Sequence, residues 1–353
     1  NISNDKGKRY RIAHKAGLVE LLEPLKAAPR VCLPTRVMTP SGHGITLAYD
    51  DSKGRLASIH DDSGLTLLTV TFNGDHEAVL DLHPGTEAHV SFTLALEGEE
   101  LRTLVMPTTD QHSWTFDYTS YGSLRCLQKL VNPLGGEEEL VYKEQGHQLP
   151  GLELYVPYAT SLVVKPDRLD ETTFIKTEYD FSKNNFLGYG ASGVVWDDNY
   201  NQDHLYKFTA STFNYTSTVK HHYEGKVLRT VTRTFNRFHL LVEQVTEESG
   251  CTETMKNEYH ERSGGFAEQD ERLQLPSKMP KTWTVSGNPV DRRDEFVTFI
   301  YDKAGNLEEG RTASGIRMVR TYYPATQSDG CPADQEGFKR NLESITVNPA
   351  DDA

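Results

Sequence analysis

The sequence predicts an all-β fold of antiparallel β-hairpin repeats that form a curved or spiralling sheet ribbon. One observation is a recurring phrase of an aromatic residue, an aspartate, a glycine and a leucine, clearest at residues 301–307 (YDKAGNL). A second is its spacing, because the aromatic residues that open and close each unit stand 22 to 24 positions apart. A third is the alternating or β-branched character of the stretches between the turns. A fixed period in the twenties is typical of repeat proteins.

Residues 1–30 resemble a repeat least, and we interpret them as a lead-in to a single repeat region that spans residues 1–353. Within the lead-in, residues 17–24 (GLVELLEP) fit either a short helix that ends at Pro24 or a pair of strands. The sequence leaves both alternatives open. Because the chain begins with Asn1 rather than methionine, we expect it to be a piece of a longer protein.

The first clear unit begins at residues 49–56 (YDDSKGRL), and a second turn signal follows at residues 63–65 (SGL). Residues 65–72 (LTLLTVTF) then alternate as a strand with one solvated face does. Further units begin at residues 116–118 (FDY), 235–240 (FNRFHL) and 301–307. The residues assigned to repeat positions are Tyr49, Asp50, Gly54, Leu56, Gly64, Asp117, Tyr118, Gly122, Tyr142, Phe235, Gly250, Tyr259, Tyr301, Asp302, Gly305, Leu307, Gly315 and Tyr323.

The chemistry of one phrase explains why it makes a turn. Asp302 can accept a hydrogen bond from the backbone two residues further on, and Gly305 supplies a positive φ without a steric penalty. Leu307 then begins the next strand. Recurrent turns also fit an ordinary β-sandwich, in which turn signals come every 8 to 12 residues. The fixed order of aromatic, aspartate, glycine and leucine favours the repeat.

On these motifs the chain resembles the YD-repeat family of Rhs proteins, which includes polymorphic-toxin Rhs proteins and the related shell subunits of insecticidal toxin complexes. Further segments that match long bacterial members are residues 34–36 (PTR), 39–44 (TPSGHG), 132–137 (NPLGGE), 146–151 (GHQLPG), 185–188 (NFLG), 322–325 (YYPA) and 329–332 (DGCP). The resemblance covers nearly the whole chain. Each motif is short, so the strength of the resemblance lies in the order in which the motifs occur along the chain.

The resemblance implies a segment of a hollow Rhs-type shell that encloses and shields a C-terminal toxin domain for delivery. The implied partners are the remainder of the shell, the enclosed toxin and secretion-apparatus proteins. The implied location is a protein made in the bacterial cytoplasm and then exported as a secreted effector in competition or virulence. The family's aspartate-dependent self-cleavage core has no match in this sequence, so that activity is not carried over.

The size of such a shell shows how much of its wall this chain can form. A toxin domain of about 100 residues needs a surrounding ribbon about 140 Å in circumference. Roughly 30 strands spaced about 4.8 Å apart give about 145 Å of ribbon. The sequence therefore predicts about one turn of wall, with open sheet edges at both ends that tend to pair with other strands.

The composition of the chain limits which classes of partner it can bind. The net charge of −14 argues against nucleic acid, which needs a basic surface. No apolar run approaches the length of about 18 residues that a membrane span needs, and no signal peptide is visible. The four cysteines are widely dispersed, without metal-binding or disulfide spacing.

Tests for catalytic motifs predict no enzyme, no cofactor and no metal. Residues 188–193 (GYGASG) satisfy the dinucleotide fingerprint, but residues 194–199 (VVWDDN) cannot open a good helix, so a glycine-rich loop is expected. The thirteen histidines are scattered without a zinc pattern. Acidic runs at residues 61–62 and 137–139 fit charged strand ends better than paired catalytic carboxylates.

Two other functions compete with the shell. The first is a carbohydrate-binding β module, in which exposed aromatic faces stack on sugar rings. Its candidate residues are Trp114, Trp196 and Trp283, although the same side chains can simply pack between strands. The second is a hydrolase with an unrecognised site, such as a glycosidase or a metal-dependent enzyme.

Overall fold

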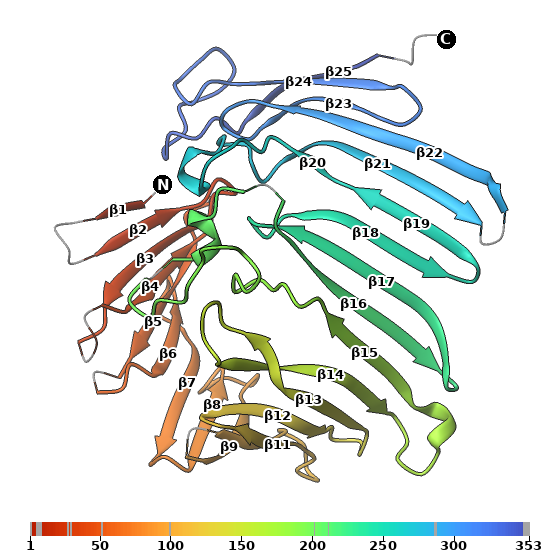
Figure 1. Cartoon of the computed structure of the whole chain (residues 1–353). Helices are drawn as coiled ribbons and strands as arrows, with labels where there is room; N and C mark the ends of the chain where they lie inside the picture. The colour runs from red at the N-terminus through yellow and green to blue at the C-terminus, as the bar shows by residue number, and fades with distance from the viewer. Residues whose placement is uncertain are drawn as a thin grey trace. The chain divides into compact units, whose positions relative to one another are not determined.

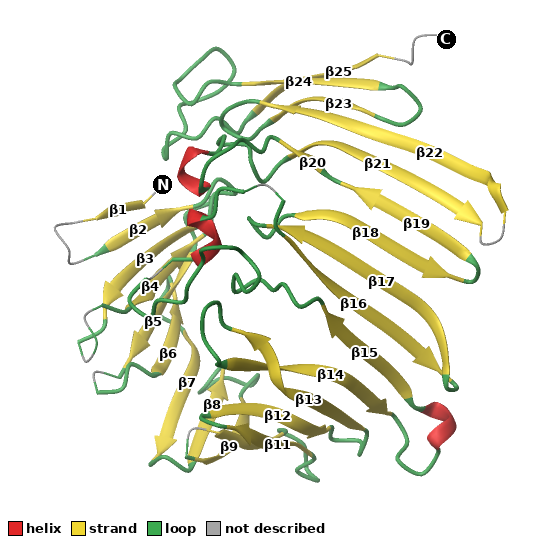
Figure 2. Cartoon of the chain, in the orientation of Figure 1, coloured by secondary structure: helices red, strands yellow, loops and turns green. Residues whose placement is uncertain are grey.

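A computed structural model describes residues 2–4, 9–26, 28, 30–50, 52–98, 100–200, 202–210, 212–285 and 288–348. Within these ranges the chain forms 25 β-strands and three short 3-10 helices (Figures 1 and 2). The all-β prediction is confirmed. The strands are fewer than the roughly 30 expected from repeat spacing, because residues 182–213 and 260–275 form long loops with two short helices instead of strands.

The chain divides into two compact units, and each is described by itself. Unit 1 comprises residues 1–117, 130–135 and 334–338. In it, strands that follow one another in sequence pair antiparallel, from β1 through β10 and into β11. These strands are β1 (Ile2–Asn4), β2 (Tyr10–Ala13), β3 (Val19–Pro24), β4 (Cys32–Met38), β5 (Gly44–Tyr49), β6 (Leu56–Asp61), β7 (Thr66–Asn73), β8 (Glu77–Leu82), β9 (Val90–Glu97), β10 (Glu100–Val105) and β11 (Ser113–Tyr121).

Unit 2 comprises residues 118–129, 136–333 and 339–353. Its antiparallel pairing runs from β13 to β19, continues from β19 to β21, and then from β21 to β25. The elements of this part of the chain are β12 (Leu124–Val131), β13 (Glu137–Gln148), β14 (Tyr155–Lys165), η1 (Glu171–Thr173), β15 (Ile175–Phe181), η2 (His204–Lys207), β16 (Asn214–Tyr223), β17 (Lys226–Asn236), β18 (Leu241–Glu248), β19 (Cys251–Lys256), β20 (Glu258–Tyr259), η3 (Phe266–Glu268), β21 (Pro276–Val285), β22 (Asn288–Tyr301), β23 (Leu307–Arg311), β24 (Arg317–Tyr322) and β25 (Leu342–Asn348).

Many of the hairpins use one turn. The first residue of the turn accepts a hydrogen bond from the amide three positions on and donates its own amide to the carbonyl four positions on. Asp302 does so with Gly305 and Asn306, and Asp61 does so with Gly64 and Leu65. The fourth residue has positive φ, +75° at Gly305 and +84° at Gly64. This is a type I turn followed by a left-handed residue, a common three-residue hairpin connection.

The side chain of the first turn residue reinforces the turn. Asp50 Oδ1 accepts amide hydrogen bonds from Ser52, Lys53 and Gly54. The bond from the Lys53 amide, together with those from the side chains of Arg55 and Ser52, holds the pKa of Asp50 well below its usual range. Asp302 Oδ1 accepts from the Asn306 amide at 2.8 Å. A turn is therefore present at Asp302 and Gly305 with the predicted positive φ, and the backbone hydrogen bond to the Asp302 carboxylate comes from the amide four residues further on.

The lead-in forms strands rather than a helix. β2 and β3 pair antiparallel, with Ala13 opposite Val19, and the turn between them contains Gly17 at φ +98°. Of the two alternatives for residues 17–24, the strand pair is the correct one. The helix is disfavoured because Val19 and Leu21 alternate in the manner of a strand.

One predicted unit is displaced along the chain. Asp117 and Tyr118 lie inside β11 rather than at its end. The turn that follows contains Gly122 at φ +59°. The aromatic and aspartate therefore do not open a turn at this position, because β11 continues as far as Tyr121.

Apolar burial is sparse in both units. The buried cluster in the described residues contains Ala191, Leu205 and Phe213, with Val194, Phe208 and Tyr215 packed against it. Most other strand residues are half-buried, as all eleven residues of β14 except exposed Tyr155 illustrate.

Candidate functional site

The loops of unit 2 build the most developed site. The loop of residues 182–213 is fixed by Asn185, whose side chain is 1% exposed. Asn185 Oδ1 accepts hydrogen bonds from the amides of Leu187 and Tyr189, and its Nδ2 donates to the carbonyl of Gln148 at 2.9 Å. The Trp196 amide donates to the carbonyl of Pro150. Asn185 and Trp196 therefore attach the loop to the β13–β14 connection.

The glycine-rich stretch inside this loop is not a dinucleotide fold. Gly188, Gly190 and Gly193 all have positive φ, and residues 194–203 contain no helix among those described. The dinucleotide fingerprint requires a helix at this point to present amides to a pyrophosphate. The prediction of a glycine-rich loop is confirmed.

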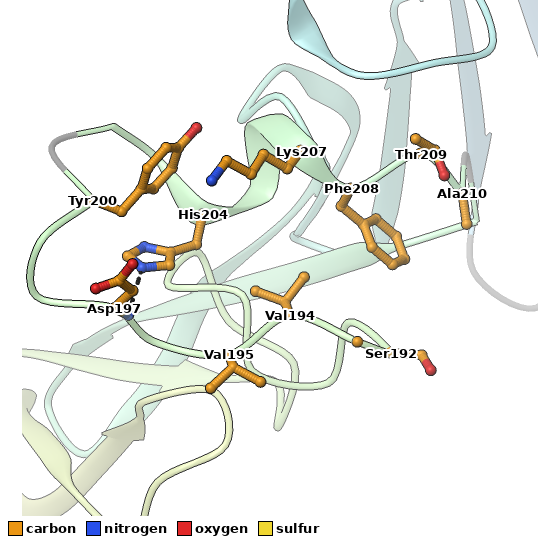
Figure 3. A pocket seen from close by; sticks show the side chains of 11 residues that line it. Ser192, Val194, Val195, Asp197, Tyr200, His204, Lys207, Phe208, Thr209 and Ala210 are labelled. Carbon is orange, nitrogen blue, oxygen red and sulfur yellow. Dashed lines mark hydrogen bonds between the residues drawn. The ribbon is translucent and has the colours of Figure 1, made fainter.

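This loop encloses a cleft of about 510 Å³ (Figure 3). Its lining residues are Ser192, Gly193, Val194, Val195, Asp197, Tyr200, His204, Lys207, Phe208, Thr209 and Ala210. Val194, Val195, Phe208 and Ala210 supply apolar surface. Ser192, Thr209 and Lys207 supply hydroxyl and ammonium donors. The cleft therefore combines apolar walls with donor groups.

The polar end of the cleft is ordered by η2. His204 Nε2 accepts the amide hydrogen of Asp197 at 2.9 Å, so the ring carries its proton on Nδ1 when neutral (Figure 3). The His204 ring stacks on Trp196 at 4.5 Å between centroids and meets the edge of Tyr200. Lys207 Nζ lies 3.5 Å from the centroid of the Tyr200 ring.

On its other side, η2 is bound to the turn after β17. His239 Nδ1 lies 2.7 Å from the Tyr215 hydroxyl, and its Nε2 contacts Asp203 Oδ2. Asp203 also caps η2, because its Oδ1 accepts the Leu205 amide. Burial alone would raise the pKa of Asp203, but the bonds from His239 and Leu205 lower it. Burial raises the pKa of the Tyr215 hydroxyl, which keeps it a donor.

The neighbouring Arg237 is fully buried. Its Nε donates to Glu261 at 2.9 Å, and its Nη atoms donate to the carbonyls of Phe208 and Arg262. The guanidinium also lies 4.3 Å from the Phe238 ring centroid. A buried charge is tolerated where each of its nitrogens is hydrogen-bonded in this way. Arg237 therefore joins the two long loops to the β17–β18 turn.

Among the predicted repeat positions, tyrosine hydroxyls reach across the sheet. Tyr49 donates to the carbonyl of Pro34, and Tyr142 donates to that of Leu127, in each case 15 residues upstream. Tyr322 does the same with Leu307, whereas the predicted residue was its neighbour Tyr323. Burial raises the pKa of the Tyr49 and Tyr142 hydroxyls and so preserves them as donors.

The remaining repeat positions lie apart along the two units. Tyr301 ends β22, Leu307 begins β23, Leu56 begins β6, and Phe235 and Tyr259 lie in β17 and β20. Gly54, Gly250 and Gly315 lie in turns, each with positive φ. The structure therefore spreads the predicted positions over many hairpins and does not gather them into one site.

The three tryptophans are not brought together. Trp114 lies in β11 of unit 1, opposite Leu104. In unit 2, one face of Trp196 is covered by His204, and Trp283 donates to Glu253 while Lys281 and Arg293 lie over its ring. Sugar stacking needs an open ring face, which Trp196 offers on one side at most.

Sequence reasoning missed the cleft and its supports. Lys207, Asp203 and His239 lie in segments without hydrophobic periodicity, and Asn185 entered only as part of a family motif. One signal was available: His239 stands where Gly305 and Gly64 stand in their own turns. A residue that replaces glycine at a left-handed position often has a specific role.

Other site types find no support in the part of the chain that the structure describes. No group of three or more His, Cys, Asp and Glu side chains there could hold a metal ion. Among the same residues, no helix has the length and apolar character needed to cross a membrane.

No protein-family model and no curated protein sequence matches the chain. Among solved structures, the chain is similar to one in the crystal structure of TcdB2-TccC3-TEV, with a TM-score of 0.27 and 11% identity over 97% of this chain and 20% of that chain. It is also similar to one in the Tc holotoxin pore of Photorhabdus luminescens, with a TM-score of 0.22 and 10% identity over 89% of this chain and 20% of that chain. The chain spans about a fifth of the length of these solved chains. Its structural neighbours are thus weakly similar chains from Tc toxin complexes.

Proposed function

We propose that the chain is a wall segment of an Rhs-type shell, which encloses and shields a toxin domain for delivery. The observation that supports this most is a ladder of antiparallel strands joined by a recurring turn, with sparse apolar burial among the described residues. Such a sheet separates two aqueous spaces, whereas a sandwich uses its inner faces to exclude water. In this proposal the chain has no catalytic role.

In unit 2, the β16–β17 pair has one polar face and one more apolar face. On one face of the β16–β17 pair, Thr218 lies opposite Thr232, and their hydroxyls are 3.2 Å apart. On the other face, Val219 lies opposite Val231, which is 3% exposed. Neighbouring strands therefore stabilise each other through cross-strand side-chain pairs.

The last strand offers an edge for the rest of such a wall. β25 pairs with β24 on one side. Its side chains Leu342, Ile345 and Val347 are 44%, 51% and 60% exposed. A long apolar edge of this kind is a template for another strand. In the proposal, the partners of this chain are further wall strands and an enclosed toxin.

Small-angle X-ray scattering of the full chain tests whether it is a wall. A compact globule of this length has a radius of gyration of about 20 Å. A single-layer segment should exceed that value clearly and show a hollow or flattened distance distribution. A radius near 20 Å with a globular distribution would contradict the proposal.

Enclosure is tested separately in the longer protein that contains this sequence. A downstream domain held inside a shell should resist protease while the wall is intact. It should become sensitive when the wall is opened by mild denaturant. A domain that is cleaved equally under both conditions would refute enclosure while leaving the wall itself to the scattering measurement.

A further inference from the structure

We propose that the cleft of residues 192–210 binds a small amphipathic anion, an acyl or aryl group that carries a carboxylate or a phosphate. This binding site is independent of the wall function. It rests on the unused donors of the cleft, on its apolar walls and on how firmly the loop is held.

The charge of the site comes from Lys207. Within the described ranges Lys207 forms no ion pair, and its ammonium rests against the ring of Tyr200. A cation–π contact orients the ammonium but leaves its charge unneutralised and its protons available. An anionic group in the cleft would supply the missing partner.

The cleft lining also contains neutral donors. The hydroxyls of Ser192 and Thr209 are exposed and make no hydrogen bond to a described residue. Gly193 has φ +83°, and a Cβ placed there would meet nothing within 4 Å, so its backbone is open to an approaching group. Backbone amides and hydroxyls in a concave loop are typical ligands for oxyanions.

The lining also contains one carboxylate, that of Asp197. Asp197 Oδ1 accepts the amide hydrogen of Asn199 at 2.9 Å, and the Asp197 amide is bound to His204. The donors of the cleft without a hydrogen-bond or ion-pair partner among the described residues are Lys207, Ser192 and Thr209, so the proposal places the anionic group of the ligand at Lys207 and away from the Asp197 carboxylate. With a net charge of −14 on the chain, general attraction of anions is unfavourable, so any such binding must be local.

The apolar part of the ligand has a matching surface. Val195 is 60% exposed, and Val194, Phe208 and Ala210 also line the cleft (Figure 3). The volume of about 510 Å³ falls within the range of small-molecule sites. Covering these side chains would contribute hydrophobic free energy that a bare inorganic anion cannot supply.

The cleft is also preformed. Leu205 is fully buried beneath it, Asp203 caps η2, and Asn185 attaches the glycine-rich loop to the strand connection. A site held this way loses little conformational entropy when a ligand binds.

Calorimetric titration of the full chain with four octyl compounds tests the site. Octanoate and octyl phosphate should bind, and octan-1-ol and octylamine should bind about tenfold more weakly or not at all. A preference between the two anions tells a carboxylate site from a phosphate site. Equal binding of octanol and octanoate, or no binding of either anion at millimolar concentration, would overturn the proposal.

Variants complete the test. Lys207→Met should weaken octanoate binding about tenfold, and Val195→Asp should weaken it further by repulsion and lost apolar contact. Lys183→Met is the matched control, because Lys183 is an exposed lysine of the same loop that also lies over a tyrosine ring. Both altered cleft residues are exposed, so melting temperatures should stay unchanged. Equal losses of octanoate affinity in the Lys207 and Lys183 variants would refute the proposed role of Lys207.

Discussion

His239 occupies a backbone conformation that glycine takes in equivalent turns. Its φ is +61°, and Asn236 brackets it with the same hydrogen bonds that Asp302 forms around Gly305. A non-glycine residue in this region costs on the order of 1 kcal/mol. The imidazole offsets that cost by joining Tyr215 to Asp203. The strained residue is thus explained by the two bonds that only its ring can make.

Substitution of His239 separates the strain from the bonds. We expect His239→Ala to destabilise the chain by about 2 kcal/mol, because the bonds are lost and the strain stays. His239→Gly should cost about 1 kcal/mol less, because the strain is relieved. Urea unfolding measures both. Ser249→Gly, at an exposed site with φ +51°, is the control and should not destabilise. Equal losses of unfolding free energy in the two His239 variants would contradict the presence of backbone strain at this position.

Glu137 is a second residue whose environment sets its chemistry. It is 5% exposed, lies 2.6 Å from Lys129 Nζ and 3.0 Å from Lys165 Nζ, and Lys165 is its cross-strand partner. Burial would raise the pKa of Glu137, but the hydrogen bonds from the two lysines lower it to about 2. The carboxylate is therefore charged in the folded chain well below the pH at which an unfolded glutamate is protonated.

This pKa predicts acid sensitivity. Because the folded value is lowered, the stabilisation is present above pH 4.5, the ordinary value, and is lost as the pH falls from 4.5 towards 2. Glu137→Gln should lower the unfolding free energy at pH 7 by about 1–3 kcal/mol, and the difference should shrink at pH 3. Urea melts at both values check it. Glu138→Gln, at the exposed neighbouring position, should leave the unfolding free energy unchanged at both pH values. A loss that is the same at both pH values would count against the lysine contacts.

At the scale of elements, the predictable parts are those with a local cause. The turn at Asp302 and Gly305 follows from side-chain capping and from positive φ, so the sequence alone places it. The loop of residues 182–213 follows from distant contacts, such as Asn185 with Gln148, and no local pattern indicates them. The cleft lies in that loop, which is why the sequence predicts the strands better than the site.

The junction between β13 and this loop contains a buried histidine. His147 is 8% exposed, and its ring lies 4.8 Å from the rings of Tyr158 and Phe181 and 5.2 Å from Phe186. Burial lowers the pKa of His147, and the charge of Lys143 lowers it further. The neutral ring therefore helps hold the Asn185 loop against the sheet.

Mild acid should loosen this junction. The unfolded chain takes up a proton on His147 near pH 6.5 and the folded chain does so at a lower pH, so stability falls as the pH drops below 6.5. His147→Phe should remove part of the loss in melting temperature between pH 7.5 and 5.5. Scanning calorimetry measures it, with His221→Phe at an exposed strand position as the control. The same pH dependence in His147→Phe and in the unaltered chain would rule out this role.

At the scale of the whole molecule, stability should come from neighbour contacts. Most of the described strands pair with the next strand along the chain, and the chain forms two compact units. In such an arrangement the unfolding free energy is roughly the sum of contributions from individual strands and from their contacts with neighbouring strands. Only limited stretches of the chain then unfold together. A turn substitution should then act on the unit that contains it.

Calorimetry of two glycine variants tests this. Gly64 in unit 1 and Gly250 in unit 2 have φ values of +84° and +77°, and a Cβ at either would meet nothing within 4 Å. Alanine at each site should therefore cost about 1–2 kcal/mol through backbone strain alone. We expect two overlapping unfolding transitions. Gly64→Ala should lower the midpoint temperature of one transition, and Gly250→Ala should lower that of the other. A single two-state transition that both variants shift equally would show that the units unfold together, because strain placed in either would then destabilise the same cooperative structure.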